Sequence, residues 1–374
     1  MQSRPAPAPS FTFRDTAPSD AAVLVRFARE AFGAPWTEDF VRWKYFANPA
    51  GRAFGRCALL DGRPAAFYGN IPVHLKLGGR AVLAAQAVDA MVAPEARRRR
   101  LFVILGQQTF AQMDEAGVAL AYAFPNPVSL AAFVERMGWK PVGAAPRWVR
   151  VLDASAVARG GGRAGPAAWL YALWLWAFSR SRPIPPTISS RRKGGDDLSI
   201  REIESFDERF DRFWQAAAAD FPIAVVRDAA YLNWRYVERP ASPYHALAAE
   251  RGGALAGWAV LSTRDAAEAR VAVVTELLAA PGENEAGPAL LAECERLARS
   301  LGCAQLQAWL LPHHDRYRRM FAAAGFVFRP ARYAPGPLRY TTPHIIRPHP
   351  AQALAPDPTQ AANWFLSAGD YDYF

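Results

Sequence analysis

Four consecutive arginines, Arg97 to Arg100, stand between an apolar segment that ends at Pro94 and a second apolar segment that begins at Leu101. The first segment reads as a buried strand, and the second has the apolar spacing of a helix. A strand, a tight basic turn and the first turn of a helix direct backbone N–H groups and the helix dipole toward one point. The sequence therefore predicts an anion site at the start of this helix.

A single carboxylate interrupts the apolar segment that precedes the arginines. Strand alternation places the side chain of Asp89 on the same face as Ala87 and Met91. If that face borders an open cleft, Asp89 is the best candidate for a base that takes a proton from an amine. A structural carboxylate with a buried partner is the alternative, and both remain open. Glu38 and Asp39 are further candidates, although they are also typical of helix N-terminal charges.

The residues from Val92 to Leu101 (VAPEARRRRL) resemble the acyl-CoA loop of the GNAT superfamily of N-acetyltransferases. In that family a strand ends in V-x-P, and R-G-x-G-x-G/A then wraps the CoA pyrophosphate ahead of a helix. Arg97 matches the first position of this motif. Arg98 and Arg100 occupy positions where glycine is usual, and Phe102 occupies the last small position. Glycine tolerates positive φ and a close phosphate, whereas arginine adds charge and volume.

A second part of the resemblance lies downstream. GNAT domains commonly have an asparagine at the end of the next strand, then a helix with a tyrosine, then Gly-Phe. Asn126 matches the asparagine, Gly138-Trp139 stands in for Gly-Phe, and Phe133 falls on the tyrosine position. That tyrosine often protonates the departing thiolate, which phenylalanine cannot do. The role is therefore left to another group, such as Tyr122 or water.

The resemblance implies direct acyl transfer from acetyl-CoA, or another acyl-CoA, to an amine, without a metal ion. A backbone N–H near the strand end is needed to stabilise the oxyanion that forms from the thioester. The expected catalytic residues are Asp89, Tyr122 and Asn126. The expected cofactor-binding residues are Met91, Val92, Ala93, Arg97, Arg98, Arg99, Arg100, Leu101, Phe102, Asn126 and Phe133.

The third quarter of the chain repeats the first. Trp43-Lys44-Tyr45 is echoed by Trp234-Arg235-Tyr236, and the turn glycines Gly62 and Gly253 follow the two tryptophans at the same spacing. Several matches in one order predict two copies of one fold. In the second copy the acidic loop 282–287 replaces the basic turn, and an acidic loop repels pyrophosphate. We therefore expect the second copy to be non-catalytic.

The resemblance and the repeat together imply an α/β (α+β) protein of two GNAT-like domains, each a mixed, mostly antiparallel central sheet flanked by helices. Helices are expected at 19–32, 37–46 and 101–116, and hairpin turns at Asp61-Gly62 and Gly78-Gly79. The expected organisation is a disordered lead at 1–10, an acyl-CoA-binding domain at 11–150, a linker at 151–196 with an apolar helix at 166–178, a second GNAT-like domain at 197–340 and a C-terminal tail at 341–374.

Composition and charge limit the classes of partner and the locations that are expected for this protein. The 374 residues carry a net charge of +10, which favours anionic partners without choosing among them. The three cysteines lack metal or disulfide spacing, and the N-terminus lacks an apolar signal, so a cytoplasmic location is expected. The apolar helix is too short to span a bilayer. Two interpretations of residues 166–182 remain open: peripheral membrane contact, or a linker helix that packs against a domain. His344 and His349 are expected at the surface.

Three functions are compatible with these features. The first is an acyl-CoA-dependent N-acetyltransferase acting on a small-molecule or peptide amine, with no DNA partner. The second is a Fem-like tandem enzyme that uses aminoacyl-tRNA, for which the positive charge and a deteriorated CoA loop are suited. The third is a catalytically inactive tandem GNAT binding or scaffold protein, which Arg98, Arg100 and Phe133 together favour. The strand–loop–helix match places the acyltransferase first.

Overall fold

The computed structural model describes residues 11–160, 170, 173–174, 176–179, 197–242, 244–266, 269–310, 313–328 and 342–371. The chain divides into two compact units. The first takes its residues from Met1–Leu75, Ala81–Pro141 and Ile345–Leu354, and the second from Lys76–Arg80, Val142–His344 and Ala355–Phe374. The lead expected at 1–10 lies outside the described residues. So does most of the apolar helix expected at 166–178, of which residues 170, 173–174 and 176–178 are described and helical.

The first sheet has the strand order β1-β2-β3-β4-β5-β15-β6. Its strands are β1 (Phe11–Asp15), β2 (Phe54–Leu60), β3 (Arg63–Leu77), β4 (Arg80–Val92), β5 (Leu120–Ala123), β6 (Lys140–Ala145) and β15 (Thr342–Pro348). β2 pairs antiparallel with both β1 and β3, whereas β4 and β5 are parallel. The predicted hairpin turn is confirmed, because Asp61 and Gly62 both have positive φ, at 49° and 79°.

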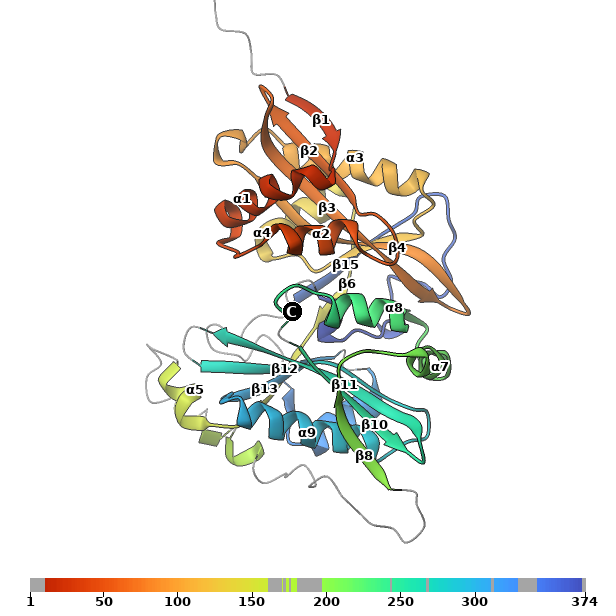
Figure 1. Ribbon diagram of the computed structural model, residues 1–374. Coiled ribbons are helices and arrows are strands. Elements are labelled where there is room, and N and C mark those ends of the chain that lie inside the picture. Colours follow the sequence, from red (N-terminus) through yellow and green to blue (C-terminus); the bar gives the residue numbers. More distant parts are fainter. Residues whose placement is uncertain are drawn as a thin grey trace, which may run out of the picture. The chain divides into compact units, whose positions relative to one another are not determined.

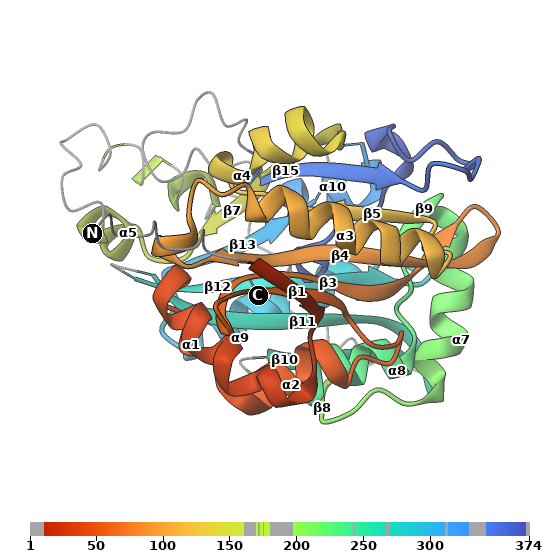
Figure 2. The ribbon, with the colours of Figure 1, turned by 90° about the horizontal axis from the view of Figure 1, so that it is seen from above.

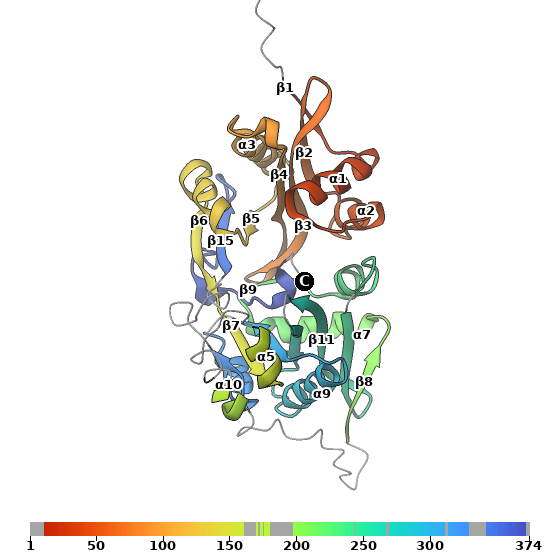
Figure 3. The same cartoon turned by 90° about the vertical axis from the view of Figure 1, so that its left-hand side faces the viewer.

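Helices cover both faces of the first sheet. Figure 3 shows α1 and α2 on one side of its strands and α3 on the other, and Figure 2 shows α3 lying along β4. The helical elements are η1 (Pro18–Asp20), α1 (Ala21–Phe32), α2 (Glu38–Phe46), η2 (Pro94–Ala96), α3 (Leu101–Glu115), α4 (Pro127–Ala131) and the π-helical η3 (Ala132–Arg136). The Thr37 hydroxyl accepts from the Phe40 amide at 3.1 Å and so caps α2.

The second sheet has the strand order β14-β7-β13-β12-β11-β10-β8. Its strands are β7 (Arg147–Val151), β8 (Leu198–Ile203), β10 (Tyr244–Arg251), β11 (Ala254–Ala266), β12 (Ala269–Ala279), β13 (Gln305–Trp309) and β14 (Val327–Phe328). Other elements of this half are α5 (Ala154–Gly160), α7 (Glu208–Ala217), η4 (Ala218–Asp220), β9 (Ile223–Val225), α8 (Ala229–Leu232), η5 (Asn233–Val237), α9 (Ala286–Ser300), α10 (Asp315–Ala323), η8 (Ala361–Asn363) and η9 (Ala368–Asp370). α9 packs against β11 and β12 (Figure 1).

Two strands pair with a sheet that most of their neighbours in the sequence do not join. β7 follows β6 directly in sequence but pairs with β13 and β14 in the second sheet. β15, from the segment expected as a tail, pairs with β5 in the first sheet. Each sheet is thus completed by a strand from the other half of the sequence. An alternating apolar pattern identifies a strand but does not say which sheet receives it.

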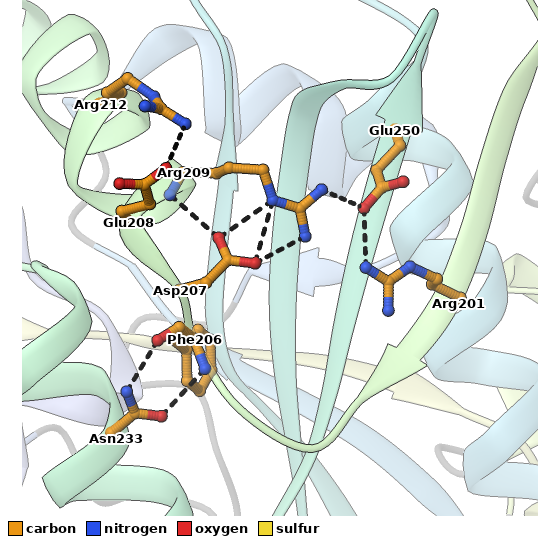
Figure 4. A network of polar contacts seen from close by, with 8 residues as sticks. All are labelled: Arg201, Phe206, Asp207, Glu208, Arg209, Arg212, Asn233 and Glu250. Atoms are coloured by element: carbon orange, nitrogen blue, oxygen red, sulfur yellow. Dashed lines mark hydrogen bonds and ion pairs between the residues drawn. The ribbon is translucent and has the colours of Figure 1, made fainter.

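An exposed polar network joins α7 to β8 and β10 in the second unit. The Arg209 guanidinium contacts Asp207 at 2.9 Å and Glu250 at 2.8 Å, and Arg201 contacts the same Glu250 oxygen at 3.0 Å (Figure 4). Such surface ion pairs contribute little individually. Within the described part of the chain, no helix has the length and apolarity needed to cross a membrane.

Candidate functional site

The parallel strands β4 and β5 separate within the first unit. Their register runs only from Ala85 to Ala87 on β4, opposite Ala121 to Ala123 on β5. β4 continues to Val92, whereas β5 ends at Ala123. The edge of residues 88–92 that would face β5 therefore lacks a β5 partner. An extended ligand can take the backbone positions that a neighbouring strand leaves there.

Two residues of the arginine loop have a backbone conformation that favours glycine. Arg97 is extended, with φ −62° and ψ 160°, whereas Arg98 and Arg100 are left-handed, with φ 63° and 59°. These are the two positions at which the resemblance expects glycine. A left-handed conformation costs a residue with a side chain about 1 kcal/mol. The loop therefore retains its shape against local strain.

The start of α3 presents unused backbone donors. Arg100 is left-handed and the following residue is helical, an alternation that turns successive N–H groups toward one side. Among the described residues, no backbone carbonyl accepts from the amides of Arg98, Arg99 or Arg100, and no side chain caps α3. All four arginine side chains, Arg97 to Arg100, are exposed. The loop thus offers both amides and guanidinium groups to an anion.

Asp89 lies in a buried cluster with two residues of α2. Its Oδ2 atom is 2.6 Å from the Nζ of Lys44 and also accepts from the Tyr45 hydroxyl. Lys44 is 2% exposed, and its ammonium lies 5.1 Å from the ring centroid of Trp36 and 5.8 Å from that of Phe40. The side chain of Asp89 therefore faces α2, with the buried partner that the alternative interpretation requires.

Lys44 and Tyr45 did not appear among the residues that the sequence assigned to a site. The internal repeat could have pointed to these two residues, because they lie inside the repeated Trp-Lys-Tyr and Trp-Arg-Tyr triplets. The repeat indicated two copies of a fold, but it did not indicate that the triplet contacts the strand carboxylate. That contact depends on how α2 packs on β4, which sequence spacing does not determine.

The aromatic residues expected at the cofactor site lie together. Phe102 and Phe133 have ring centroids 5.2 Å apart in an edge-on arrangement, and Phe133 also packs on Trp139 at 4.9 Å. Phe102 contacts Tyr68 on its other side, at 5.5 Å. The aromatic ring at the last small position of the motif thus fills space beside the ring that replaces the family tyrosine.

The remaining expected residues have separate surroundings. Tyr122 is 1% exposed in β5, beside Phe124 at a centroid distance of 5.8 Å. The Asn126 Oδ1 atom accepts from the amides of Val128 and Ser129, at 3.0 and 2.9 Å, and so caps α4. Asp89, for comparison, contacts Lys44 and Tyr45 of α2.

The backbone amides expected to stabilise an oxyanion at the end of β4 are not all free to donate to a ligand. Met91 is buried, Val92 is half-buried, and the Ala93 amide donates to the Ala65 carbonyl at 2.9 Å. An amide that already donates to a carbonyl cannot at the same time bind an oxyanion well. Any backbone donor from this part of β4 therefore has to come from a residue before Ala93.

The second unit repeats the local geometry of the first. The Tyr236 hydroxyl donates to Glu276 at 2.9 Å, as Tyr45 donates to Asp89. The Ala280 amide donates to the Ala256 carbonyl at 2.9 Å, matching the bond from Ala93 to Ala65. The repeat predicted from the sequence is therefore also a repeat of hydrogen bonds.

Comparison with known families and structures agrees with this geometry. An acetyltransferase (GNAT) domain family matches residues 12–142, and the acetyltransferase (GNAT) family matches residues 204–326. A comparison with curated proteins found no match.

Solved structures share the fold at low sequence identity. A GCN5-related N-acetyltransferase from Kribbella flavida has a TM-score of 0.59 and 16% identity, over 91% of this chain and 71% of the other. One from Anabaena variabilis has a TM-score of 0.58 and 12% identity, over 91% and 73%. Saccharomyces cerevisiae N-myristoyltransferase with bound myristoyl-CoA has a TM-score of 0.59 and 12% identity, over 92% and 84%.

The mixed α/β fold and the two-copy organisation expected from the sequence are confirmed by these matches. The chain is a tandem protein of the GNAT superfamily, with one GNAT domain in each half.

Proposed function

We propose that this protein is an acyl-CoA-dependent N-acyltransferase and that its first copy binds the acyl-CoA. The observation that carries the proposal is the loop before α3, in which Arg98 and Arg100 adopt left-handed conformations at the two positions where the resemblance expects glycine. Strained backbone of this kind is often found where a ligand binds, and it supports a binding role for the loop. The yeast structure with bound myristoyl-CoA supports an acyl-CoA as the ligand class.

The residues of the loop fit a pyrophosphate. The amides of Arg98 to Arg100 and the first turn of α3 would donate to its oxygens, and the guanidinium groups would add charge-assisted hydrogen bonds. The edge of β4 beyond Ala87 would hold the amide-containing arm that leads to the thioester. Met91 and Val92 lie at the far end of that edge, where the acyl carbonyl would be placed.

The reaction is the attack of an amine nitrogen on the thioester carbonyl carbon. A C–N bond forms, the C–S bond breaks, and the thiolate leaves. The amine loses a proton to a base, and the thiolate gains one from an acid or from water. An acetyl group is one candidate for the transferred acyl group. A small-molecule amine or a peptide is the candidate acceptor.

Asp89 is the proposed base. Lys44 and Tyr45 both donate to its Oδ2 and so fix the position of the carboxylate. We propose that it acts on the acceptor through a water molecule. Near the end of β5, we propose Tyr122 as the proton donor to the thiolate and Asn126 as a group that positions the substrate. The second copy is proposed to be non-catalytic.

Calorimetric titration of the full chain with CoA and acetyl-CoA tests the binding step. We expect binding that weakens with salt and that falls at least ~10-fold when Arg97 and Arg99 are changed together to Gln, because two charge-assisted contacts are lost. Arg296→Gln, an exposed arginine on α9, is the matched control. A protein that ignores CoA but binds tRNA with a steep salt dependence would instead be a Fem-like enzyme. A protein that binds CoA but releases no thiol with any amine would be a binding protein.

A further inference from the structure

The second copy contains a strand carboxylate equivalent to Asp89, but its surroundings are different. Glu276 precedes Pro281 at the spacing at which Asp89 precedes Pro94, and each accepts from the tyrosine of its triplet. In the second copy, however, the carboxylate is fully buried. The groups around it include Tyr236, Arg227 and, from the C-terminal residues, Gly369.

The middle residue of the triplet contacts different groups in the two copies. In the first copy Lys44 pairs with the strand carboxylate at 2.6 Å. In the second copy Arg235 donates to the backbone carbonyls of Gly369 and Tyr371, at 3.4 and 2.8 Å. A guanidinium has several donors in a fixed fork and can hold two carbonyls, which a lysine ammonium does with less precision. Arg235 thus binds the peptide backbone of the C-terminal residues, whereas Lys44 binds the strand carboxylate.

A second arginine compensates the carboxylate. Arg227 contacts Glu276 at 3.1 Å and Asp370 at 2.8 Å, and all three side chains are 0–1% exposed. It also donates to the Ser367 hydroxyl at 3.0 Å. With Arg235, two buried cations stand against two buried carboxylates. Charges removed from water are tolerated only when they are paired in this way.

The C-terminal segment, residues 364–371, fits this position closely. All of its residues are buried. Phe365 stacks on Phe221 with centroids 4.1 Å apart, and the Trp364 carbonyl accepts from His314 at 2.6 Å. A Cβ atom added to Gly369 would overlap the Tyr236 hydroxyl and a carboxylate oxygen of Glu276. Glycine is therefore required where the segment crosses the acid.

The helix start of the second copy is also filled by the chain itself. The Glu283 carboxylate accepts from the amides of Glu285 and Ala286, at 2.8 and 3.2 Å, ahead of α9. Burial would raise the pKa of Glu283, but these amides and the Arg251 guanidinium hold it below its ordinary value. The place that an external anion would take at a helix N-terminus thus already holds a carboxylate.

We propose that the second copy is a peptide-binding site that this chain fills with its own C-terminal segment. Arg235 and Arg227 select the peptide, the first through two backbone carbonyls and the second through Asp370. The ligand class is a short peptide with an aromatic residue at its entry, a glycine over Glu276 and an aspartate directly after it. Substrate binding is consequently left to the first copy.

The proposal is tested by cutting the connection to the segment in the full chain. A protease recognition sequence is inserted between Gln352 and Ala353, before the segment, and the chain is cleaved under native conditions. We expect the released fragment 353–374 to remain bound during size-exclusion chromatography. Labelled synthetic peptide 353–374 then measures exchange and competition.

Peptide variants make the test independent of protein folding. The Gly369→Ala and Asp370→Asn peptides should compete at least ~10-fold more weakly than the unmodified peptide, because one clashes and the other loses its pairing with Arg227. The Asp357→Asn peptide, changed at an exposed carboxylate before the segment, should compete like the unmodified one. Equal competition by all four peptides would overturn the proposal, as would immediate loss of the fragment from the cleaved chain.

A change on the protein side tests the role of Arg235. Arg235→Lys restores the residue of the first copy, and we expect it to hold the fragment at least ~10-fold more weakly. Arg201→Lys, in the exposed network of the same unit (Figure 4), is the matched control and should leave retention unchanged. Equal retention by the two variants would remove Arg235 from the selection of the segment. CoA titration of the cleaved chain reports separately on the first copy.

Discussion

At the scale of single residues, the most informative feature is an arginine in a conformation suited to glycine. The motif alignment located Arg98 and Arg100 at glycine positions, but it did not say whether the loop would keep its shape. Both residues have positive φ, and both side chains are exposed. Exposure explains how the substitution is accommodated, since the side chains extend into solvent and only the backbone is strained.

Returning these two positions to glycine should not harm the fold. Arg98→Gly and Arg100→Gly each remove about 1 kcal/mol of strain and add a comparable entropy to the unfolded chain, so the free energy of unfolding should change by less than ~1 kcal/mol. Arg97 has a negative φ, so Arg97→Gly relieves no strain and should lower the free energy of unfolding by about 0.5–1 kcal/mol. Denaturant unfolding measures all three. A larger loss at Arg98 or Arg100 than at Arg97 would contradict the assignment of strain.

The pairing of Lys44 with Asp89 makes a second prediction at this scale. Lys44→Met leaves a buried carboxylate without its cation, and we expect a loss of about 3–5 kcal/mol in the free energy of unfolding of the first unit. Lys44→Met combined with Asp89→Leu should lose less than Lys44→Met alone. Lys140→Met, at an exposed lysine, is the control. If the double variant were less stable than the single one, the penalty would not come from an unpaired charge.

At the scale of elements, local signals predicted helices and turns better than long-range pairing. The cap at Thr37, the hairpin at Asp61-Gly62 and the helix after the arginines all follow from short-range chemistry. The strand β3, from Arg63 to Leu77, connects the two predicted hairpin turns without a break. The exchange of β7 and β15 between the sheets depends on tertiary pairing, which no local pattern encodes.

The cap of α4 gives a prediction that separates structure from chemistry. Asn126→Ala removes the acceptor for two amides and should lower the free energy of unfolding by about 1 kcal/mol. Asn126→Ser should restore most of that stability, because a hydroxyl also caps. If Asn126 positions the substrate as proposed, acyl transfer should stay slow in Asn126→Ser. Asp228→Ala, which removes the cap of α8 in the second copy, should cost similar stability and leave the rate unchanged.

At the scale of the whole molecule, the sequence predicted a duplicated fold but not how its end is used. The histidines expected at the surface show this difference. His344 is 1% exposed and packs edge-on against Trp364 at 4.6 Å, because the C-terminal segment folds back over it. His349 is half-buried, with its Nε2 3.2 Å from the Asp114 carbonyl. A polar residue in a proline-rich tail gives no sign of burial until its distant aromatic neighbour is placed.

The burial of His344 and His314 predicts how stability depends on pH. Burial lowers the pKa of His344 to about 3 and that of His314 to about 4. The unfolded chain binds protons at both sites below its ordinary pKa of about 6.5, whereas the folded chain does not, so acid favours unfolding. Between pH 7 and pH 5, His344 alone should cost about 2 kcal/mol. Burial raises the pKa of Glu276; Arg227 opposes this rise and Asp370 adds to it. Because a raised carboxyl pKa makes the folded state bind a proton more readily than the unfolded state, Glu276 favours folding as the pH falls, opposite to the histidines.

Comparison of variants isolates the histidine contribution, because Glu276 is common to all of them. His344→Phe keeps an aromatic contact with Trp364 and removes the titrating group, so its free energy of unfolding should fall less steeply from pH 7 to pH 5 than that of the unmodified protein. Denaturant unfolding at several pH values measures these slopes. Equal slopes for His344→Phe and the unmodified chain would mean that His344 is protonated in the folded state, and that the segment above it does not exclude water as the buried contacts require.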